Sequence, residues 1–96
     1  MFETEIFRAL ADPTRRAVFE KLAAAELSVS ELTAGFEVSQ PAISQHLATL
    51  REAGLVAKRR EGRYVYYRAQ PDGLSPIMSW MERYASPAEV ELARTA

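Results

Sequence analysis

The feature that most constrains the fold of this chain is a change of hydrophobic period at Gly54. Before this glycine, apolar residues recur at the spacing of one helix face: Ile43, Leu47 and Leu50. After it come two extended runs rich in Val and Tyr, joined by a short turn at Gly62. The sequence therefore predicts a long helix over residues 40–53 that leads directly into a β-hairpin over residues 55–68.

Three shorter helices are predicted before the long one, over residues 3–10, 13–24 and 30–36. Asp12 stands just before a proline, which is an N-cap followed by a residue that the first helical turn tolerates. Ser28 and Ser30 are alternative caps for the third helix. The long helix also opens with a proline in its first turn, where amides lack intrahelical partners.

The chain after the hairpin is interrupted by Pro71 and Gly73, and a last amphipathic helix is predicted over residues 75–85. A capping signal at Ser86 then predicts a frayed tail helix within a short tail, residues 86–96. A chain of 96 residues is long enough for one domain with one modest core. We therefore expect a single domain over residues 1–96. Its predicted fold class is mainly α (α+β), a winged helix-turn-helix of about five helices with a two-stranded β-hairpin wing.

Several functions are disfavoured by what the sequence lacks. It has no cysteine, and the single histidine, His46, does not supply the several ligands of a zinc site, so we expect no metal and no cofactor. Without a Gly-rich phosphate loop, a serine elbow or a distinctive carboxylate pair, the chain does not resemble an enzyme. No run of about 18 apolar residues is present, and residues 1–5 lack the features of a secretion signal. We therefore expect a cytoplasmic protein with no membrane partner.

The charge is distributed unevenly along the chain. The formal net charge is −1, which argues against a generally basic nucleic-acid binder. Residues 1–37 carry seven acidic and four basic side chains, whereas residues 38–68 carry six basic and two acidic ones. This pattern fits a localised phosphate-binding face, and it also fits an ordinary solvated charge run.

The outward face of the helix over residues 40–53 carries small or hydrogen-bonding side chains. A solvated helix usually favours Lys and Glu there, whereas Ser, Gln and Ala suit a surface that approaches another molecule closely. In a major groove, Gln pairs with adenine, and Ser donates or accepts a hydrogen bond. The candidate DNA-binding residues of this segment are Ser39, Gln40, Pro41, Ser44, Gln45, His46 and Arg51. For His46, at the edge of the buried stripe, a partly buried role with one hydrogen bond remains an alternative to DNA contact.

The hairpin adds three candidates: Arg60, Arg63 and Tyr66. The two arginines flank the turn, where they are expected to hold the DNA backbone. Side chains alternate across a strand, so Tyr64 and Tyr66 share one face. Tyrosine pairs also stabilise a hairpin without any ligand, and this reading stays open for each tyrosine.

Three segments in the same order closely resemble the ArsR/SmtB family of bacterial winged-helix repressors. They are A-L-A-D-P-T-R-R at residues 9–16, V-S-Q-P-A-I-S-Q-H-L-A-T-L-R-E-A-G-L-V at residues 38–56, and R-R-E-G-R-Y-V-Y-Y-R at residues 59–68. The resemblance covers roughly residues 3–84. It implies a homodimer joined through the first and last helices, with the helix that begins near Ser39 in the major groove and the hairpin on flanking DNA.

The apolar residues that fit such a dimer surface are Phe2, Ile6, Phe7, Ile77, Trp80, Met81 and Tyr84. Burial in the core of a single subunit is their alternative role. Where the last helix of the family often continues with aromatic and basic residues, Ser86-Pro87 here is expected to break or kink it. This departure bears on the extent of the dimer surface.

The segment E-L-S-V-S-E-L at residues 26–32 lies in register with E-L-C-V-C-D-L, the motif of metal-sensing family members. Both cysteine positions are serine here. A serine hydroxyl is a poor ligand for the soft metals that thiolates select, but serine is among the best N-caps. The chain thus resembles the metal-independent, cysteine-free branch of the family. Some members of that branch repress their own operon, and the resemblance names no effector.

The leading hypothesis is a homodimeric, sequence-specific DNA-binding transcriptional repressor that recognises an imperfect palindrome in double-stranded DNA without metal sensing. A winged-helix module that binds another protein through Trp80, Met81 and the aromatic residues of the first helix is the alternative. DNA binding at low salt separates the two hypotheses.

Overall fold

The computed structural model describes residues 2–95 and has a winged helix-turn-helix fold, which confirms the predicted fold class. The first half of the chain contains α1 (Phe2–Leu10), α2 (Pro13–Ala24), β1 (Leu27–Ser28), α3 (Val29–Thr33) and α4 (Gln40–Glu52). The second half contains β2 (Val56–Glu61), β3 (Tyr64–Ala69), the 3-10 helix η1 (Pro71–Leu74), α5 (Ser75–Glu82) and α6 (Pro87–Thr95). None of the helices within residues 2–95 has the length and apolar character needed to cross a membrane.

One apolar core joins α1 to α4 and the base of the sheet. It consists of Ile6, Ala9, Val18, Leu22, Leu32, Ile43, Leu47, Leu50, Leu55 and Val56, each at most 3% exposed. The three core residues of α4 are those that recur at helical spacing in the sequence. Burial of this stripe against α2 and α3 fixes which face of α4 remains open to solvent.

Two arginines hold the corner between α1 and α2. Asp12 caps α2 by accepting from the backbone N–H groups of Thr14 (2.8 Å) and Arg15 (3.1 Å). The Arg15 Nε atom donates to the Ala9 carbonyl at 2.7 Å, and Arg16 donates to the Leu10 carbonyl at 2.6 Å. Cations near the last carbonyls of a helix are favourable because those carbonyls lack intrahelical partners and carry partial negative charge. The segment over residues 9–16 therefore has a structural role.

The helix α3 is shorter than the sequence predicted. Its N-cap is Ser28 rather than Ser30, and its last residue is Thr33 rather than residue 36. The chain continues from there as a turn in which the Gly35 and Phe36 N–H groups donate to carbonyls three residues earlier. Apolar spacing alone does not distinguish such a turn from a final helical turn.

The junction between α4 and the wing depends on Gly54. This residue has φ +79°, a left-handed conformation that glycine adopts without steric cost. The Gly54 N–H donates to the Arg51 carbonyl at 3.0 Å, and the Leu55 N–H donates to the Leu50 carbonyl at 2.9 Å. This bond pattern is a Schellman C-cap, which ends the helix and aims the chain into β2.

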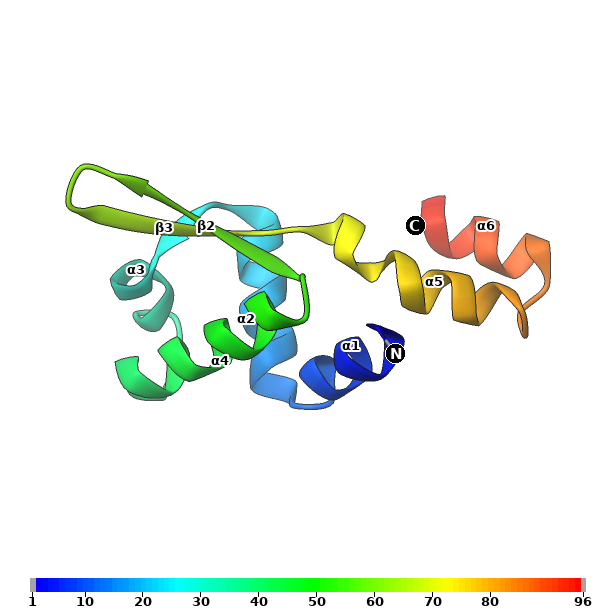
Figure 1. Cartoon of the computed structure of the whole chain (residues 1–96), viewed down its shortest axis with the longest axis horizontal. Helices are drawn as coiled ribbons and strands as arrows, with labels where there is room; N and C mark the ends of the chain where they lie inside the picture. The colour runs from blue at the N-terminus through cyan, green and yellow to red at the C-terminus, as the bar shows by residue number, and fades with distance from the viewer. Residues whose placement is uncertain (1, 96) are drawn as a thin grey trace.

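The sheet has three antiparallel strands in the order β1-β3-β2. In the hairpin, Val56 pairs with Ala69 and Glu61 pairs with Tyr64, so the two strands remain in register throughout. The two-residue strand β1 was not predicted; Leu27 pairs with Tyr67, and Ser28 pairs with Tyr66. Only the two middle rows of the hairpin, Lys58–Tyr67 and Arg59–Tyr66, therefore belong to a three-stranded sheet, and the part beyond them projects from the body as a two-stranded ribbon (Figure 1).

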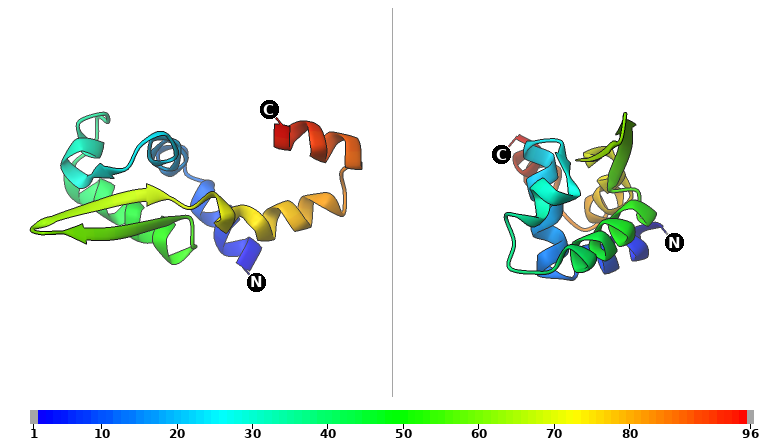
Figure 2. Two further views of the ribbon diagram at one scale, coloured as in Figure 1. Left: turned by 90° about the horizontal axis from the view of Figure 1, so that it is seen from above. Right: turned by 90° about the vertical axis from the view of Figure 1, so that its left-hand side faces the viewer.

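The helix α5 extends from the other end of the body, and α6 runs back beside it (Figures 1 and 2). Ser86 and Glu89 form a reciprocal capping box at the start of α6, and Arg94 forms an ion pair with Glu82 of α5. The sequence predicted this capping signal and a frayed tail helix after it. The structure has a helix over residues 87–95, joined to α5 by the Arg94–Glu82 ion pair.

Candidate nucleic-acid interface

The outward face of α4 is open to solvent and lacks Lys and Glu along its first three turns. The exposed residues on and beside this face include Ser39, Gln40, Pro41, Ser44, Gln45, Ala48 and Arg51. Ser39 caps the helix by accepting from the Ala42 N–H at 3.2 Å, and Pro41 occupies the first turn. The result is a rigid helix start that presents short side chains able to donate and accept hydrogen bonds.

His46 lies at the edge of this face and is partly buried. The Arg15 backbone N–H is the main cause that holds the pKa of Asp12 below its usual value, and the Thr14 N–H, the Arg15 charge and His46 act in the same direction.

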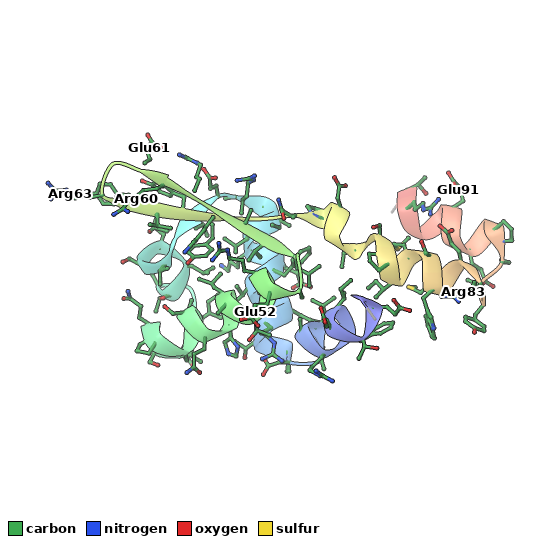
Figure 3. All side chains as sticks on the ribbon, in the orientation of Figure 1. Glu52, Arg60, Glu61, Arg63, Arg83 and Glu91 are labelled. Atoms are coloured by element: carbon green, nitrogen blue, oxygen red, sulfur yellow. The ribbon has the colours of Figure 1, made fainter. Side chains whose placement is uncertain are left out.

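Arg60 and Arg63 lie at the tip of the wing (Figure 3). Arg60 donates from Nε to the Gly62 carbonyl at 3.2 Å, which orients its side chain at the turn. Tyr64 is 60% exposed, and its ring centroid lies 6.4 Å from that of Tyr66, as expected for two tyrosines on one strand face. The tip therefore presents guanidinium and phenol groups to solvent.

A basic groove connects α4 to the wing. Its lining residues are Arg51 of α4, Lys58, Arg59 and Arg60 of β2, and Val65 of β3. Lys58 was not among the candidates chosen from the sequence. Its separation of two residues from Arg60 places both side chains on the same strand face, and this spacing was the available signal. Groove and wing tip together make a positively charged strip beside the outward face of α4.

Arg59 differs from its basic neighbours because its guanidinium is held by carboxylates. It donates to Glu26 at 2.7, 2.9 and 3.0 Å and to Glu61 at 2.5 Å. The Arg59 hydrogen bonds lower the pKa of Glu26, and the Glu26 and Glu61 carboxylates raise the pKa of Arg59. The charge of Arg59 is thus largely compensated within the protein.

The residues expected at a dimer surface differ in how exposed they are. Phe7, Trp80, Met81 and Tyr84 are 39–75% exposed. Ile77 is half-buried against the core, and Ile6 is 2% exposed within it, so the structure gives Ile6 an intramolecular role instead. The side chain of Phe2 lies outside the described residues.

Three of the exposed residues form a continuous aromatic cluster on α1, α5 and the turn that follows α5. The Phe7 and Trp80 ring centroids lie 5.5 Å apart in an edge-to-face arrangement, and those of Trp80 and Tyr84 lie 5.1 Å apart. We call Phe7, Trp80, Met81 and Tyr84 the aromatic face. Large apolar side chains gathered on a surface are typical of an interaction site.

Ser28, in register with a metal-ligating position, has a different role in this structure. It accepts from the Glu31 N–H at 3.2 Å, while its own N–H donates to the Glu31 carboxylate at 2.8 Å. Within residues 2–95, no three side chains of the His, Cys, Asp or Glu types are grouped so as to hold a metal ion.

Comparisons with known proteins agree on one family. The model of the family described as "Bacterial regulatory protein, arsR family" matches residues 12–58. The chain is 52% identical over 78 residues to the arsenic resistance transcriptional regulator ArsR1 of Pseudomonas putida, with 80% of the chain aligned, but it spans only 58% of that protein's length. It is also 44% identical over 78 residues to the HTH-type transcriptional regulator Rv2034 of Mycobacterium tuberculosis, covering 81% of this chain and 73% of the relative.

The fold has a solved counterpart as well. An ArsR-like transcriptional regulator from Rhodococcus sp. RHA1 superposes with a TM-score of 0.78 at 34% identity, covering 96% of this chain and 87% of the other. The structural likeness therefore extends over nearly the whole chain, whereas the family model matches from the α2 cap into β2.

Proposed function

This chain belongs to the arsR family of bacterial regulatory proteins, and on that premise we propose that it is a homodimeric, sequence-specific DNA-binding repressor that needs no metal cofactor. The relatives named above are transcription regulators rather than enzymes, in agreement with the sequence analysis. Because regulators of this family bind DNA, we take DNA as the partner of this chain.

The single observation that carries the proposal is the pairing of α4 with the basic strip. The outward face of α4 has the side chains that read base edges, namely Gln40, Ser44 and Gln45. Arg51, Lys58 and Arg60 line the adjoining groove, and their charges suit the phosphates that flank a major groove. In this proposal, α4 reads the sequence while the groove and wing tip fix the orientation of the protein on the duplex.

The aromatic face supports the homodimer. One copy of the chain has one α4 and one wing, which reach a single half-site. Two copies related by a two-fold axis would place their α4 helices in successive major grooves about 34 Å apart, on an imperfect palindrome. Phe7 and Trp80 lie on α1 and α5, on the side of the body away from the wing, so pairing through them leaves both DNA-binding faces open (Figure 1).

The absence of metal sensing is supported by the role of Ser28. Its hydroxyl accepts from a backbone N–H in the capping box, and hydroxyl oxygen has little affinity for soft metals. The proposal expects DNA binding to be the same with a chelator, with Zn²⁺ and with arsenite.

The testing experiment is a gel shift with duplexes selected from a random pool, carried out at several salt concentrations and with each of these additions. Retarded duplex at low salt, with the same affinity under all three conditions, supports the proposal. If no duplex is retarded, the proposed DNA-binding function is wrong. If arsenite or Zn²⁺ releases the duplex from the protein, only the proposed metal independence is wrong.

A further inference from the structure

We propose that Arg59 is a positioning residue for DNA binding: held by Glu26 and Glu61, it fixes the angle at which the wing leaves the body and contacts no phosphate itself. This inference rests on the proposed DNA-binding function. The inference gives Arg59 a different role from Arg60 and Lys58, although all three residues are basic and adjacent in sequence.

The first observation is the saturation of the guanidinium. Nε donates to both carboxylate oxygens of Glu26 at 2.9 and 3.0 Å, one terminal nitrogen donates to Glu26 at 2.7 Å, and the other donates to Glu61 at 2.5 Å. All three nitrogens are therefore engaged with carboxylates. Charge-assisted bonds in this forked geometry are more directional than a single lysine contact, so they hold the side chain in one place.

The second observation is where this cluster lies in the sheet. Arg59 pairs with Tyr66 across the hairpin, and Tyr66 pairs with Ser28 of β1. The Arg59 guanidinium carbon lies 5.1 Å from the centre of the Tyr66 ring, so the side chain crosses the central strand to reach Glu26. This row is the last one in which all three strands are paired; the rows over residues 60–65 have only two.

The third observation is the distance between Arg59 and the wing tip. Gly62, in the turn, lies three positions after Arg59, a length of roughly 10 Å at the rise of a β-strand. A tilt of about 10° at Arg59 therefore displaces the tip by roughly 2 Å. A two-stranded ribbon has little stability of its own, and its direction depends on what holds its base. A displacement of this size separates a guanidinium from a phosphate at hydrogen-bond distance.

The bond to Glu26 also couples the wing to the helix-turn-helix. Glu26 lies between α2 and β1, two residues before the Ser28 cap of α3, and it is 33 residues from Arg59 in sequence. The wing and the helices that position α4 are thus joined outside the apolar core. We call Glu26, Arg59, Glu61 and Tyr66 the wing clamp.

Electrostatics and positioning predict opposite results for Glu26→Gln. Removing this carboxylate makes the protein less negative and frees Arg59 to meet a phosphate, so electrostatics alone predicts tighter DNA binding and a steeper salt dependence. The wing clamp predicts weaker binding, by roughly three- to tenfold, because the wing loses its fixed angle. The salt dependence would stay unchanged, because the loosened wing still reaches its phosphates in the complex and the affinity is lost in ordering the wing there.

Two further variants complete the test. Glu20→Gln makes the same charge change at an exposed site on α2, away from the clamp, and is expected to bind DNA as tightly as the unmutated chain or slightly more tightly. Arg59→Lys keeps the charge but lacks the fork, and it is expected to weaken binding in the same way as Glu26→Gln.

The measurements are DNA affinity by fluorescence anisotropy across a salt series, on a duplex selected with the unmutated chain, and amide ¹⁵N relaxation of the free protein. The expected result is weaker binding with an unchanged salt slope, together with lower order parameters at residues 61–64, for Glu26→Gln and Arg59→Lys only. Tighter DNA binding by Glu26→Gln overturns the proposed role of the wing clamp. Order parameters and DNA affinity that both stay unchanged in Glu26→Gln and Arg59→Lys overturn it as well. If the unmutated chain binds no duplex, the proposed function fails, and the relaxation data still decide whether the clamp orders the wing.

Discussion

The backbone N–H of Ser28 donates to the Glu31 carboxylate at 2.8 Å, and the backbone N–H of Glu31 donates to the Ser28 hydroxyl at 3.2 Å. This reciprocal pair starts α3 at a position where metal-sensing members of the family resembled by the sequence have a cysteine. The same place in the chain thus serves here to begin a helix, and the geometry accounts for the serine without any ligand.

The capping role predicts different costs for the two serines of this segment. Ser28→Ala removes an N-cap and is expected to lower the free energy of unfolding by about 1 kcal/mol. Ser30 is exposed within α3 and is the matched control, because Ser30→Ala is expected to change that free energy by less than about 0.5 kcal/mol. Urea unfolding followed by circular dichroism measures both. Equal losses for the two variants would contradict the capping role.

The wing tip is predicted to bind DNA without reading its sequence. Arg63→Ala is expected to weaken binding to specific and random duplexes alike, and to reduce the slope of log affinity against log salt by roughly 0.9 for the lost phosphate contact. The check is an affinity series between low and moderate salt on both duplexes. An unchanged slope would show that Arg63 contacts no phosphate.

The start of α4 is predicted to behave in the opposite way. Gln40 is exposed beside the Ser39 cap, so Gln40→Ala is expected to reduce discrimination at one base pair by roughly 1 to 3 kcal/mol and to leave random-sequence binding unchanged. Competition between the selected duplex and single-base variants of it measures this effect. If Gln40→Ala and Arg63→Ala had the same effect on specific and random duplexes, the assignment of base recognition to α4 and of backbone contact to the wing would be wrong.

Much of this arrangement follows from local sequence patterns. The helix α4, its glycine stop and the hairpin were predicted because apolar spacing and turn residues act over a few positions. The bond between Arg59 and Glu26 was not predicted, because it joins residues 33 positions apart. Without it, Arg59 looks like one more basic residue of the wing. The strand β1 has only two residues, too few for an alternating pattern.

The apolar face of α1 is a second case in which the sequence pattern does not predict which residues are buried. Ile6 and Phe7 are neighbours in one amphipathic helix, yet Ile6 is 2% exposed and Phe7 is 41% exposed. Periodicity indicates that a helix has an apolar side, but the neighbouring helix decides which of its residues are covered. Here α1 packs on α5 as well as on α2, and Phe7 contacts Trp80 of α5 edge to face.

The cap of α2 predicts a specific acid dependence. The folded-state pKa of Asp12 lies below its unfolded value of about 3.9, so its carboxylate adds stability above that pH, and the contribution is lost as the pH falls through the folded pKa. Asp12→Asn retains a good N-cap but does not titrate. Below about pH 4, its free energy of unfolding is therefore expected to fall less steeply than that of the unmutated chain. Urea unfolding over a pH series tests this, and parallel curves would contradict it.

The aromatic face is predicted to hold two copies together. Trp80 is 39% exposed and lies between Phe7 and Tyr84, so Trp80→Ala is expected to weaken self-association by roughly tenfold or more while the fold is retained. Leu92→Ala is the control, because Leu92 is 71% exposed on α6 outside this face. Sedimentation equilibrium of both variants measures the effect. Identical association constants would place the dimer contact elsewhere.

Selection of bound duplexes from a random pool tests the central claim most directly. A dimer that inserts two α4 helices into one side of a duplex should enrich sequences with two inverted half-sites whose centres lie about 10 to 10.5 base pairs apart, or a multiple of this spacing. Enrichment of a single unrepeated half-site, or no enrichment over the starting pool, would contradict the account.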